Sequence, residues 1–180
     1  SGRKWRSTSR ATAAAARTLS VRASAVPPEW RRVFSFARFN AVQTACLPQA
    51  LETDSNLLLV APTGCGKTVA MELALIRMLA AAPLGKAVYI APLRSLCAER
   101  HRDWSARFGR GTCVALTGDD TLEVGGSIHA RLAACRVILT TAEKWDSVTR
   151  TWTDHVYLLG AVGLLLIDEV RWCRPRSPAI

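Results

Sequence analysis

Residues 57–68 read Leu-Leu-Leu-Val-Ala-Pro-Thr-Gly-Cys-Gly-Lys-Thr, and they decide the fold. The apolar run Leu57–Val60 is typical of a buried strand, and it leads into a loop of small residues followed by a helical pattern from Thr68. A strand, a loop and a helix in this order present backbone N–H groups to a polyphosphate at the start of the helix. The stretch therefore predicts a binding site for a nucleoside triphosphate, against the alternative of a chance glycine-rich turn.

Each residue type in the loop has a role in this chemistry. Gly64 and Gly66 can adopt positive φ angles and let phosphate oxygens approach the backbone. Lys67 would place its charge on the outer phosphates, and Thr68 would offer its hydroxyl to Mg²⁺. The nucleotide-binding residues expected here are Ala61, Pro62, Thr63, Gly64, Cys65, Gly66, Lys67 and Thr68, with Ala61 standing where the strict pattern has glycine.

Short apolar runs alternate with helical segments along the rest of the chain. A helix is expected over Thr68–Ala82, and an arginine-rich one over Ser95–Phe108. Near-continuous apolar strands separated by helices predict an α/β fold with a parallel sheet and helices on both faces. The expected strands are Leu57–Val60, Ala87–Ile90, Cys113–Leu116, Val137–Leu139 and Val162–Ile167.

An acidic pair, Asp168-Glu169, follows the last of these strands. Ligands of an open parallel sheet bind at the carboxyl ends of its strands. Asp168 would hold Mg²⁺ through water, and Glu169 would polarise the water that attacks the terminal phosphate. Alone, such a pair is typical of a surface turn, but its position about a hundred residues after a phosphate loop favours catalysis. We therefore predict Lys67, Asp168 and Glu169 as catalytic residues, and Thr68 and Asp168 as the metal site.

The charge of the chain is concentrated at its ends. The chain has 180 residues, 49% of them hydrophobic, so one core of ordinary domain size is expected. Its net charge is +10: residues 1–38 hold nine basic residues against Glu29, residues 39–170 hold twelve against thirteen acidic ones, and residues 171–180 hold three. Nonspecific affinity for nucleic acid is therefore expected to reside largely in the N-terminal segment.

Cysteine usage and apolar runs exclude several classes of protein. The six cysteines are scattered without a C-x-x-C pair, which argues against a zinc site or a disulfide framework and for a reducing compartment. The longest apolar run, near Leu164–Ile167, has the length of a strand, so no membrane partner is expected.

The sequence predicts three regions. Residues 1–27, rich in Ser, Ala, Thr and Arg, are expected to form a disordered basic tail, with a transit peptide as the alternative. Pro27-Pro28 marks the start of a domain over residues 28–170. Residues 171–180 are expected to be a divergent tail, since Pro175 and Pro178 prevent a helix there.

Several short motifs support a family resemblance. They are Phe39-Asn40-x-x-Gln43, residues 61–68, Ala91-Pro92-Leu93-Arg94-Ser95-Leu96, Leu116-Thr117-Gly118-Asp119, Thr140-Thr141-Ala142-Glu143-Lys144-Trp145-Asp146 and Asp168-Glu169-Val170. Over about residues 28–170, they resemble the first RecA-like domain of a superfamily-two DEAD/DEAH-type helicase. The Thr-x-Glu-Lys-Trp-Asp block narrows this to the branch of the spliceosomal, exosome-associated, alkylation-repair and meiotic helicases, and the chain is most similar to the meiotic crossover DNA helicases.

The resemblance implies roles for two groups of residues. Phe39 would stack on adenine and Gln43 would pair with the base edge, which makes ATP with Mg²⁺ the expected cofactor. Other motifs would touch the phosphodiester backbone of one strand, without reading bases. These residues are Pro92, Leu93, Arg94, Thr117, Gly118, Asp119, Thr141, Glu143 and Lys144. Without the family context, Arg94 and Lys144 read equally well as solvated surface charges.

The implied function is the ATP-binding domain of a nuclear, ATP-dependent helicase acting on single-stranded or junction DNA. Ala142 stands where the family has Pro, Arg171 stands where it has His, and the family pattern stops at Val170. A second RecA-like domain would have to supply the arginines that stabilise phosphoryl transfer, so this chain alone is expected to be nearly inactive. Two alternatives remain at this point: a non-catalytic short isoform that acts as a nucleotide-gated binding module, and an RNA helicase of the same branch. An organelle is the alternative location if the N-terminal tail is a transit peptide.

Overall fold

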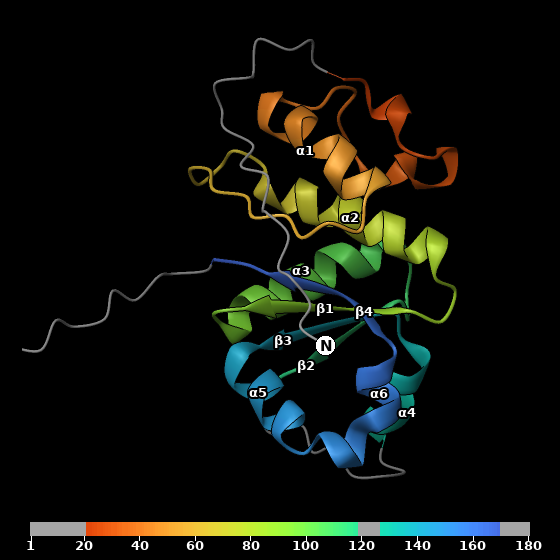
Figure 1. Cartoon of the computed structure of the whole chain (residues 1–180), viewed down its shortest axis with the longest axis vertical. Coiled ribbons are helices and arrows are strands. Elements are labelled where there is room, and N and C mark those ends of the chain that lie inside the picture. The colour runs from red at the N-terminus through yellow and green to blue at the C-terminus, as the bar shows by residue number, and fades with distance from the viewer. Residues whose placement is uncertain (1–20, 119–126, 170–180) are drawn as a thin grey trace, which may run out of the picture. The chain divides into compact units, whose positions relative to one another are not determined.

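The computed structural model describes residues 21–118 and 127–169, which Figure 1 colours by residue number. The chain forms two compact units, the first ending at Gly85 and the second beginning at Lys86, and each is described by itself. Parts of three sequence predictions lie outside the described residues: most of the basic tail, Asp119, and everything from Val170 onward.

Two packed helices, α1 (Ala41–Glu52) and α2 (Lys67–Ala81), form the body of the first unit. α1 begins after Asn40, whose side chain accepts a hydrogen bond from the backbone N–H of Gln43. The Gln43 side chain in turn accepts one from the backbone N–H of Asn40. This reciprocal capping box satisfies two amides at the start of the helix. The buried apolar residues of these two helices are Cys46, Leu47, Ala50, Ala70, Leu73, Leu75, Ile76 and Met78.

Residues 21–27 are ordered, although they fall within the expected disordered tail. Arg22 forms an antiparallel bridge with Arg38, and a 3-10 helix spans Ala23–Ala25. Val26 is buried, just before a second 3-10 helix at Pro28–Val33. The expected boundary at residue 27 therefore lies too late, because this segment packs on its own unit in spite of its polar, basic composition.

Leu57–Val60 forms no strand in the structure, so the first of the expected strands is wrong. Leu58 is 58% exposed and Val60 is 86% exposed. A strand needs a neighbouring strand for its backbone N–H and C=O groups. Within the described part of the first unit, β pairing is confined to the isolated bridge between Arg22 and Arg38, so the apolar run has no ladder to join there.

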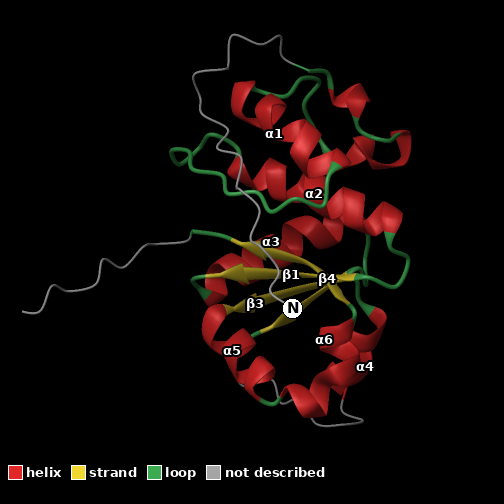
Figure 2. Cartoon of the chain, in the orientation of Figure 1, coloured by secondary structure: helices red, strands yellow, loops and turns green. Residues whose placement is uncertain are grey.

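The second unit contains a four-stranded parallel sheet with the strand order β2-β3-β1-β4 (Figure 2). Ala87 of β1 pairs with Val137 of β3 on one side and with Leu164 of β4 on the other. Because every pair is parallel, the carboxyl ends of all four strands lie at one edge. The predicted parallel sheet is confirmed for four of the five expected strands. These are β1 (Lys86–Ala91), β2 (Cys113–Leu116), β3 (Val137–Thr141) and β4 (Val162–Ile167).

Helices cover both faces of this sheet, as predicted (Figure 1). α3 (Arg94–Phe108) packs on one face, where Trp104 contacts Tyr89 of β1. Val88 and Ile90 alternate with Tyr89 along β1 and face the opposite core. The elements on that side are α4 (Ser127–Ala134), α5 (Ala142–Arg150), the 3-10 helix Trp152–His155 and α6 (Val156–Gly160).

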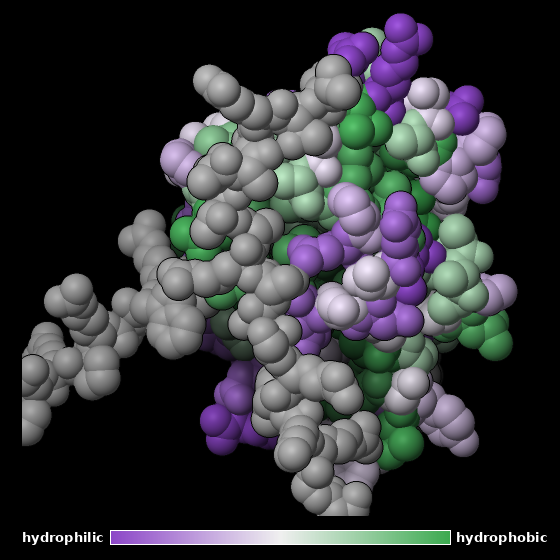
Figure 3. All heavy atoms as spheres, turned by 45° about the horizontal axis from the view of Figure 1, so that its top comes forward, coloured by the Kyte–Doolittle hydropathy of each residue, from purple (hydrophilic) through white to green (hydrophobic). Residues whose placement is uncertain are grey.

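Polar and apolar residues are interspersed on the face of the molecule that Figure 3 shows. Large apolar side chains at the surface include Leu84, Trp152 and Tyr157. Among the described helices, none combines the length and the apolar content that a membrane span requires.

Candidate functional site

The expected phosphate loop leads directly into α2. Gly66 precedes the helix with a φ of +78°, in the left-handed region. Among the described residues no side chain caps α2, and in its first turn the backbone N–H of Val69 donates to the carbonyl oxygen of Gly66 at 3.1 Å, which leaves the N–H groups of Lys67 and Thr68 for an anion. The ammonium of Lys67 donates to the carbonyl oxygens of Ala61 and Pro62 at 2.9 and 3.0 Å. An uncapped helix start, a left-handed glycine and an ammonium held within the loop fit the phosphates of a nucleotide.

The start of α1 contacts this loop. Asn40 Nδ2 donates to the carbonyl oxygen of Cys65 at 3.0 Å. Gln43 Nε2 lies so close to Gly66 that a Cβ atom at position 66 would collide with it. Gln43 is therefore placed beside the loop, and its pairing with adenine stays a prediction. Asn40 was quoted within a motif but given no role, although Asn with Gln three residues later at a helix start is the signature of a capping box.

Phe39 is buried in an aromatic cluster. Its ring is 1% exposed and packs edge-to-face against Phe34 and Phe36, with ring centroids 5.4 and 5.2 Å apart. At 1% exposure the ring has almost no surface open to a base in this structure, because the apolar side of this segment is buried in the first unit. The stacking of Phe39 on adenine stays a prediction.

The acidic pair lies at the carboxyl end of β4. The backbone N–H of Asp168 donates to the carbonyl oxygen of Ile90 at 2.9 Å, which continues the pairing of β4 with β1. Asp168 Oδ1 accepts a hydrogen bond from the backbone N–H of Glu169 at 3.0 Å. Glu169 is exposed and has a φ of +51°, a conformation that side chains with a Cβ atom rarely adopt. Backbone strain of this kind is typical of functional sites.

Tyr89 is a neighbour of the acidic pair that the sequence analysis missed. Its hydroxyl donates to Asp168 Oδ2 at 2.8 Å. Burial, and then the hydrogen bond to Asp168, raise the pKa of Tyr89 above its ordinary value, so the hydroxyl keeps its proton at neutral pH. The available signal was a tyrosine within the otherwise aliphatic run Ala87–Ile90, because the hydroxyl of a buried tyrosine needs a hydrogen-bond partner.

A cleft of about 490 Å³ lies in the second unit, beside the carboxyl ends of β1 and β3. Seven of the residues predicted to touch a nucleic-acid backbone line it, together with Ser147, which the sequence analysis did not name. Thr117 precedes the cleft residue Gly118 but is not among the lining residues, and Asp119 lies outside the described chain. The lining residues are Pro92, Leu93, Arg94, Gly118, Thr141, Glu143, Lys144 and Ser147.

Two helices begin at this cleft. α3 starts at Arg94, and its first turn has no side-chain cap among the described residues. α5 starts after Thr141, whose hydroxyl accepts a hydrogen bond from the backbone N–H of Lys144 at 3.4 Å. Helix N-termini carry partial positive charge, and the side chains of Arg94 and Lys144 add two full charges against the single carboxylate of Glu143. The cleft is therefore electropositive and suits phosphate groups.

Gly118 lies between the two cationic side chains. Lys144 Nζ donates to the carbonyl oxygen of Gly118 at 3.4 Å. The Arg94 guanidinium packs over its Cα, where a Cβ atom would lie 2.5 to 2.9 Å from the guanidinium atoms. Gly118 also has a φ of +58°. The backbone conformation favours glycine here, and a Cβ atom would have to push the Arg94 guanidinium aside.

The chain matches a known family over most of its length. The model of the DEAD/DEAH box helicases matches residues 40–172. The chain belongs to the DEAD/DEAH box helicase family. This helicase chain is 45% identical over 153 residues to the probable ATP-dependent DNA helicase HFM1 of Xenopus tropicalis, covering 81% of the chain and 11% of the relative. It is 44% identical over 146 residues to activating signal cointegrator 1 complex subunit 3 of Gallus gallus, covering 79% of the chain and 6% of the relative.

The fold of the helicase chain is also similar to a solved structure, the DUF1998 helicase MrfA bound to DNA and AMPPNP. The TM-score is 0.64 at 15% identity, over 80% of this chain and 21% of that one. The RecA-like α/β fold and the resemblance to helicases, both predicted from the motifs, are thereby confirmed. The chain spans 11% and 6% of the lengths of the two curated relatives named above.

Replacing Gly118 by alanine is expected to weaken the binding of single-stranded nucleic acid by this helicase chain about fivefold, a loss of about 1 kcal/mol. The added methyl group would displace the Arg94 guanidinium from the cleft. Gly111→Ala is the matched control, because Gly111 has a φ of +85° but a Cβ atom there would meet nothing within 4 Å. Fluorescence anisotropy with a labelled oligonucleotide measures both variants, and an equal loss of affinity in the two would contradict the role of Arg94.

Proposed function

We propose that this chain is the ATP-binding part of an ATP-dependent DNA helicase and that its cleft holds one strand by the phosphodiester backbone. The observation that carries the proposal is the cleft itself, where two helix N-termini converge with Arg94 and Lys144. Membership of the DEAD/DEAH box helicase family supports the activity. The name of the relative HFM1, a probable ATP-dependent DNA helicase, supports DNA as the substrate.

ATP would bind at the phosphate loop. The first-turn amides of α2 and the ammonium of Lys67 would hold its outer phosphates, since Lys67 would exchange the carbonyl oxygens of its own loop for charged phosphate oxygens. Thr68 and Asp168 would hold Mg²⁺, which neutralises charge on the phosphates during transfer. Glu169 would orient and polarise the attacking water.

The cleft offers two side-chain cations and the amides of two helix starts to phosphate groups. Two side-chain cations and helix-start amides bind any sequence equally, which suits an enzyme that moves along a strand. Arginines of a second RecA-like domain would complete the site for phosphoryl transfer, and we propose that this domain belongs to the same full-length protein, acting in the nucleus.

A salt titration of single-stranded DNA binding tests the cleft. The log of affinity falls with the log of salt concentration by about 0.7 for each phosphate that a cation neutralises. The double variant Arg94→Gln, Lys144→Gln is therefore expected to flatten the slope by about 1.4. Residues 1–38 hold nine basic residues against one acidic residue. Their contribution to the salt slope is the same in the variant and the wild type, so it cancels in the comparison.

Arg102→Gln provides the control for this titration. Arg102 is exposed on α3, the same helix as Arg94, but it does not line the cleft. Its loss is expected to leave the slope within about 0.3 of the wild type. Equal slopes for the wild type and the double variant would overturn the proposed cleft. An RNA strand of the same sequence that bound more tightly than DNA would overturn the choice of substrate.

A further inference from the structure

The carboxylate of Asp168 is held at both oxygens by neighbouring groups of the second unit. Oδ2 accepts from the Tyr89 hydroxyl at 2.8 Å, and Oδ1 accepts from the Glu169 backbone N–H at 3.0 Å. A carboxylate has lone pairs for about four hydrogen bonds, so each oxygen keeps capacity for the water around a metal ion. The two contacts therefore select one orientation of the carboxylate without consuming its acceptor capacity.

The sheet brings Tyr89 and Asp168 together from distant parts of the sequence. Tyr89 pairs with Leu166 in the parallel ladder of β1 and β4, and Ile90 pairs with Ile167. Asp168 directly follows β4, and its backbone N–H donates to the carbonyl oxygen of Ile90. The position of the tyrosine hydroxyl relative to the carboxylate is thus determined by the register of two strands.

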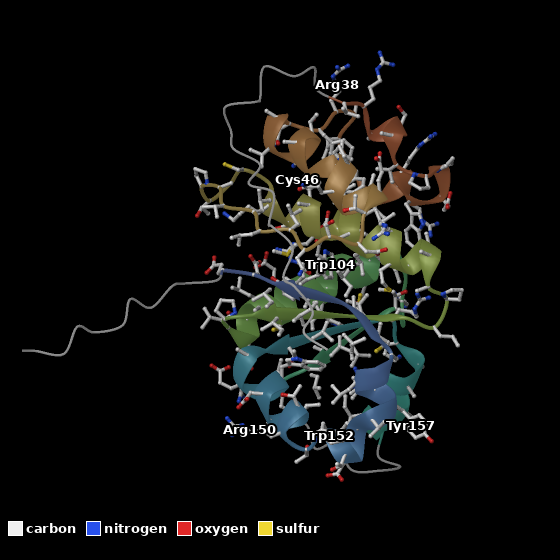
Figure 4. The ribbon with its side chains drawn as sticks, viewed as in Figure 1. Arg38, Cys46, Trp104, Arg150, Trp152 and Tyr157 are labelled. Carbon is white, nitrogen blue, oxygen red and sulfur yellow. The ribbon has the colours of Figure 1, made fainter. Side chains whose placement is uncertain are left out.

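The Tyr89 ring is itself immobilised by packing. It is 1% exposed, and it meets Trp104 of α3 in a tilted, edge-on contact with ring centroids 5.2 Å apart. Trp104, labelled in Figure 4, is fully buried and packs in turn against Phe108. The Arg100 guanidinium lies 5.9 Å from the centroid of the Trp104 ring. A side chain this constrained can hold its partner in one rotamer.

We propose that Tyr89 is a positioning residue that fixes the Asp168 carboxylate in the orientation that receives the Mg²⁺ of bound ATP. This inference rests on the proposed function. A carboxylate that is already oriented loses less conformational freedom when the metal binds. Groups that orient metal ligands in this way typically change metal affinity tenfold to a hundredfold when they are removed, about tenfold for one hydroxyl. Tyr89 does not touch the nucleotide in this proposal and acts only through Asp168.

The test measures the Mg²⁺ dependence of ATP binding. A fluorescent ATP analogue is titrated into the 180-residue chain at a series of Mg²⁺ concentrations and in EDTA. Tyr89→Phe, which keeps the ring and removes the hydroxyl, is expected to raise the half-saturating Mg²⁺ concentration about tenfold and to leave binding in EDTA unchanged. Tyr157→Phe is the matched control, because Tyr157 is 97% exposed, and its curve is expected to overlay that of the wild type.

A double variant separates positioning from general damage. Because Tyr89 acts through Asp168, adding Tyr89→Phe to Asp168→Asn is expected to raise the Mg²⁺ requirement no further than Asp168→Asn alone. The inference would be overturned if the two substitutions raised the Mg²⁺ requirement independently, so that their effects multiplied in the double variant. It would also be overturned if Tyr89→Phe weakened binding in EDTA, or if its Mg²⁺ curve coincided with that of the wild type. If the wild-type chain binds the analogue no better than Lys67→Ala, the proposed function fails instead.

Discussion

Lys67→Ala is expected to weaken ATP binding tenfold to a hundredfold. Loss of a charged hydrogen-bonding partner costs about 1.5 to 3 kcal/mol, which corresponds to this change in affinity. In the structure the ammonium already lies within the phosphate loop, where it donates to the carbonyl oxygens of Ala61 and Pro62. Alanine at this position leaves the first-turn amides of α2 as the principal donors to the phosphates.

Titration with a fluorescent ATP analogue in the presence of Mg²⁺ measures this loss. Arg77→Ala is the matched control, because Arg77 lies on the same helix and forms an ion pair with Asp54 at 2.7 Å. It removes one positive charge from α2 at a distance from the phosphate loop, so ATP affinity is expected to stay within about twofold of the wild type. Equal affinities for the wild type and Lys67→Ala would remove the basis for a nucleotide site at this loop.

Lys86→Met is expected to lower the free energy of unfolding by about 3 kcal/mol. Lys86 opens β1 and is only 8% exposed. Its ammonium donates to the carbonyl oxygens of Leu132 at 2.9 Å and Ala133 at 3.0 Å, and also to that of Cys135. These are carbonyls at the end of α4, which have no partner within the helix. Methionine fills a similar volume but leaves all three oxygens without this donor.

Chemical denaturation followed by circular dichroism measures the change in stability. Such a loss is a large fraction of the total stability of a typical domain, about 5 to 15 kcal/mol. Arg131→Met serves as the control, since Arg131 is an exposed basic residue in the last turn of the same helix. Its loss is expected to cost about 0.5 kcal/mol or less. If both variants lost the same stability, the buried contacts of Lys86 would contribute nothing beyond its charge near the helix end.

The local elements of the second unit were predictable because their signals are short-range. Ala87–Ile90, Cys113–Leu116 and Val162–Ile167 are continuous apolar runs of strand length, and each lies within or coincides with an observed strand. The same signal failed at Leu57–Val60, where hydrophobicity indicated a strand but the first unit supplies no partner strand among its described residues. Strand formation depends on a neighbour, and hydrophobicity alone does not specify one.

Much of the candidate site could also be predicted from spacing. The order of Gly64, Gly66, Lys67 and Thr68 before a helix specifies a phosphate loop, since its chemistry uses consecutive residues. Seven of the residues that the family motifs named line one cleft, and their contact with nucleic acid stays a prediction. The burial of Phe39 could not be predicted, because it depends on the aromatic side chains that surround the ring, here Phe34 and Phe36.

The sequence by itself determined the family and the parallel α/β architecture, and it predicted the phosphate loop, because each of these rests on motifs or runs of residues close together in the chain. Only the tertiary structure decided the contacts that orient the site. Tyr89 and Asp168 are 79 residues apart and meet through the register of β1 and β4. Arg94 packs over Gly118 because the loops after β1 and β2 end at the same edge of the sheet. Contacts of this kind depend on strand order and register, which a single sequence does not encode in any local pattern.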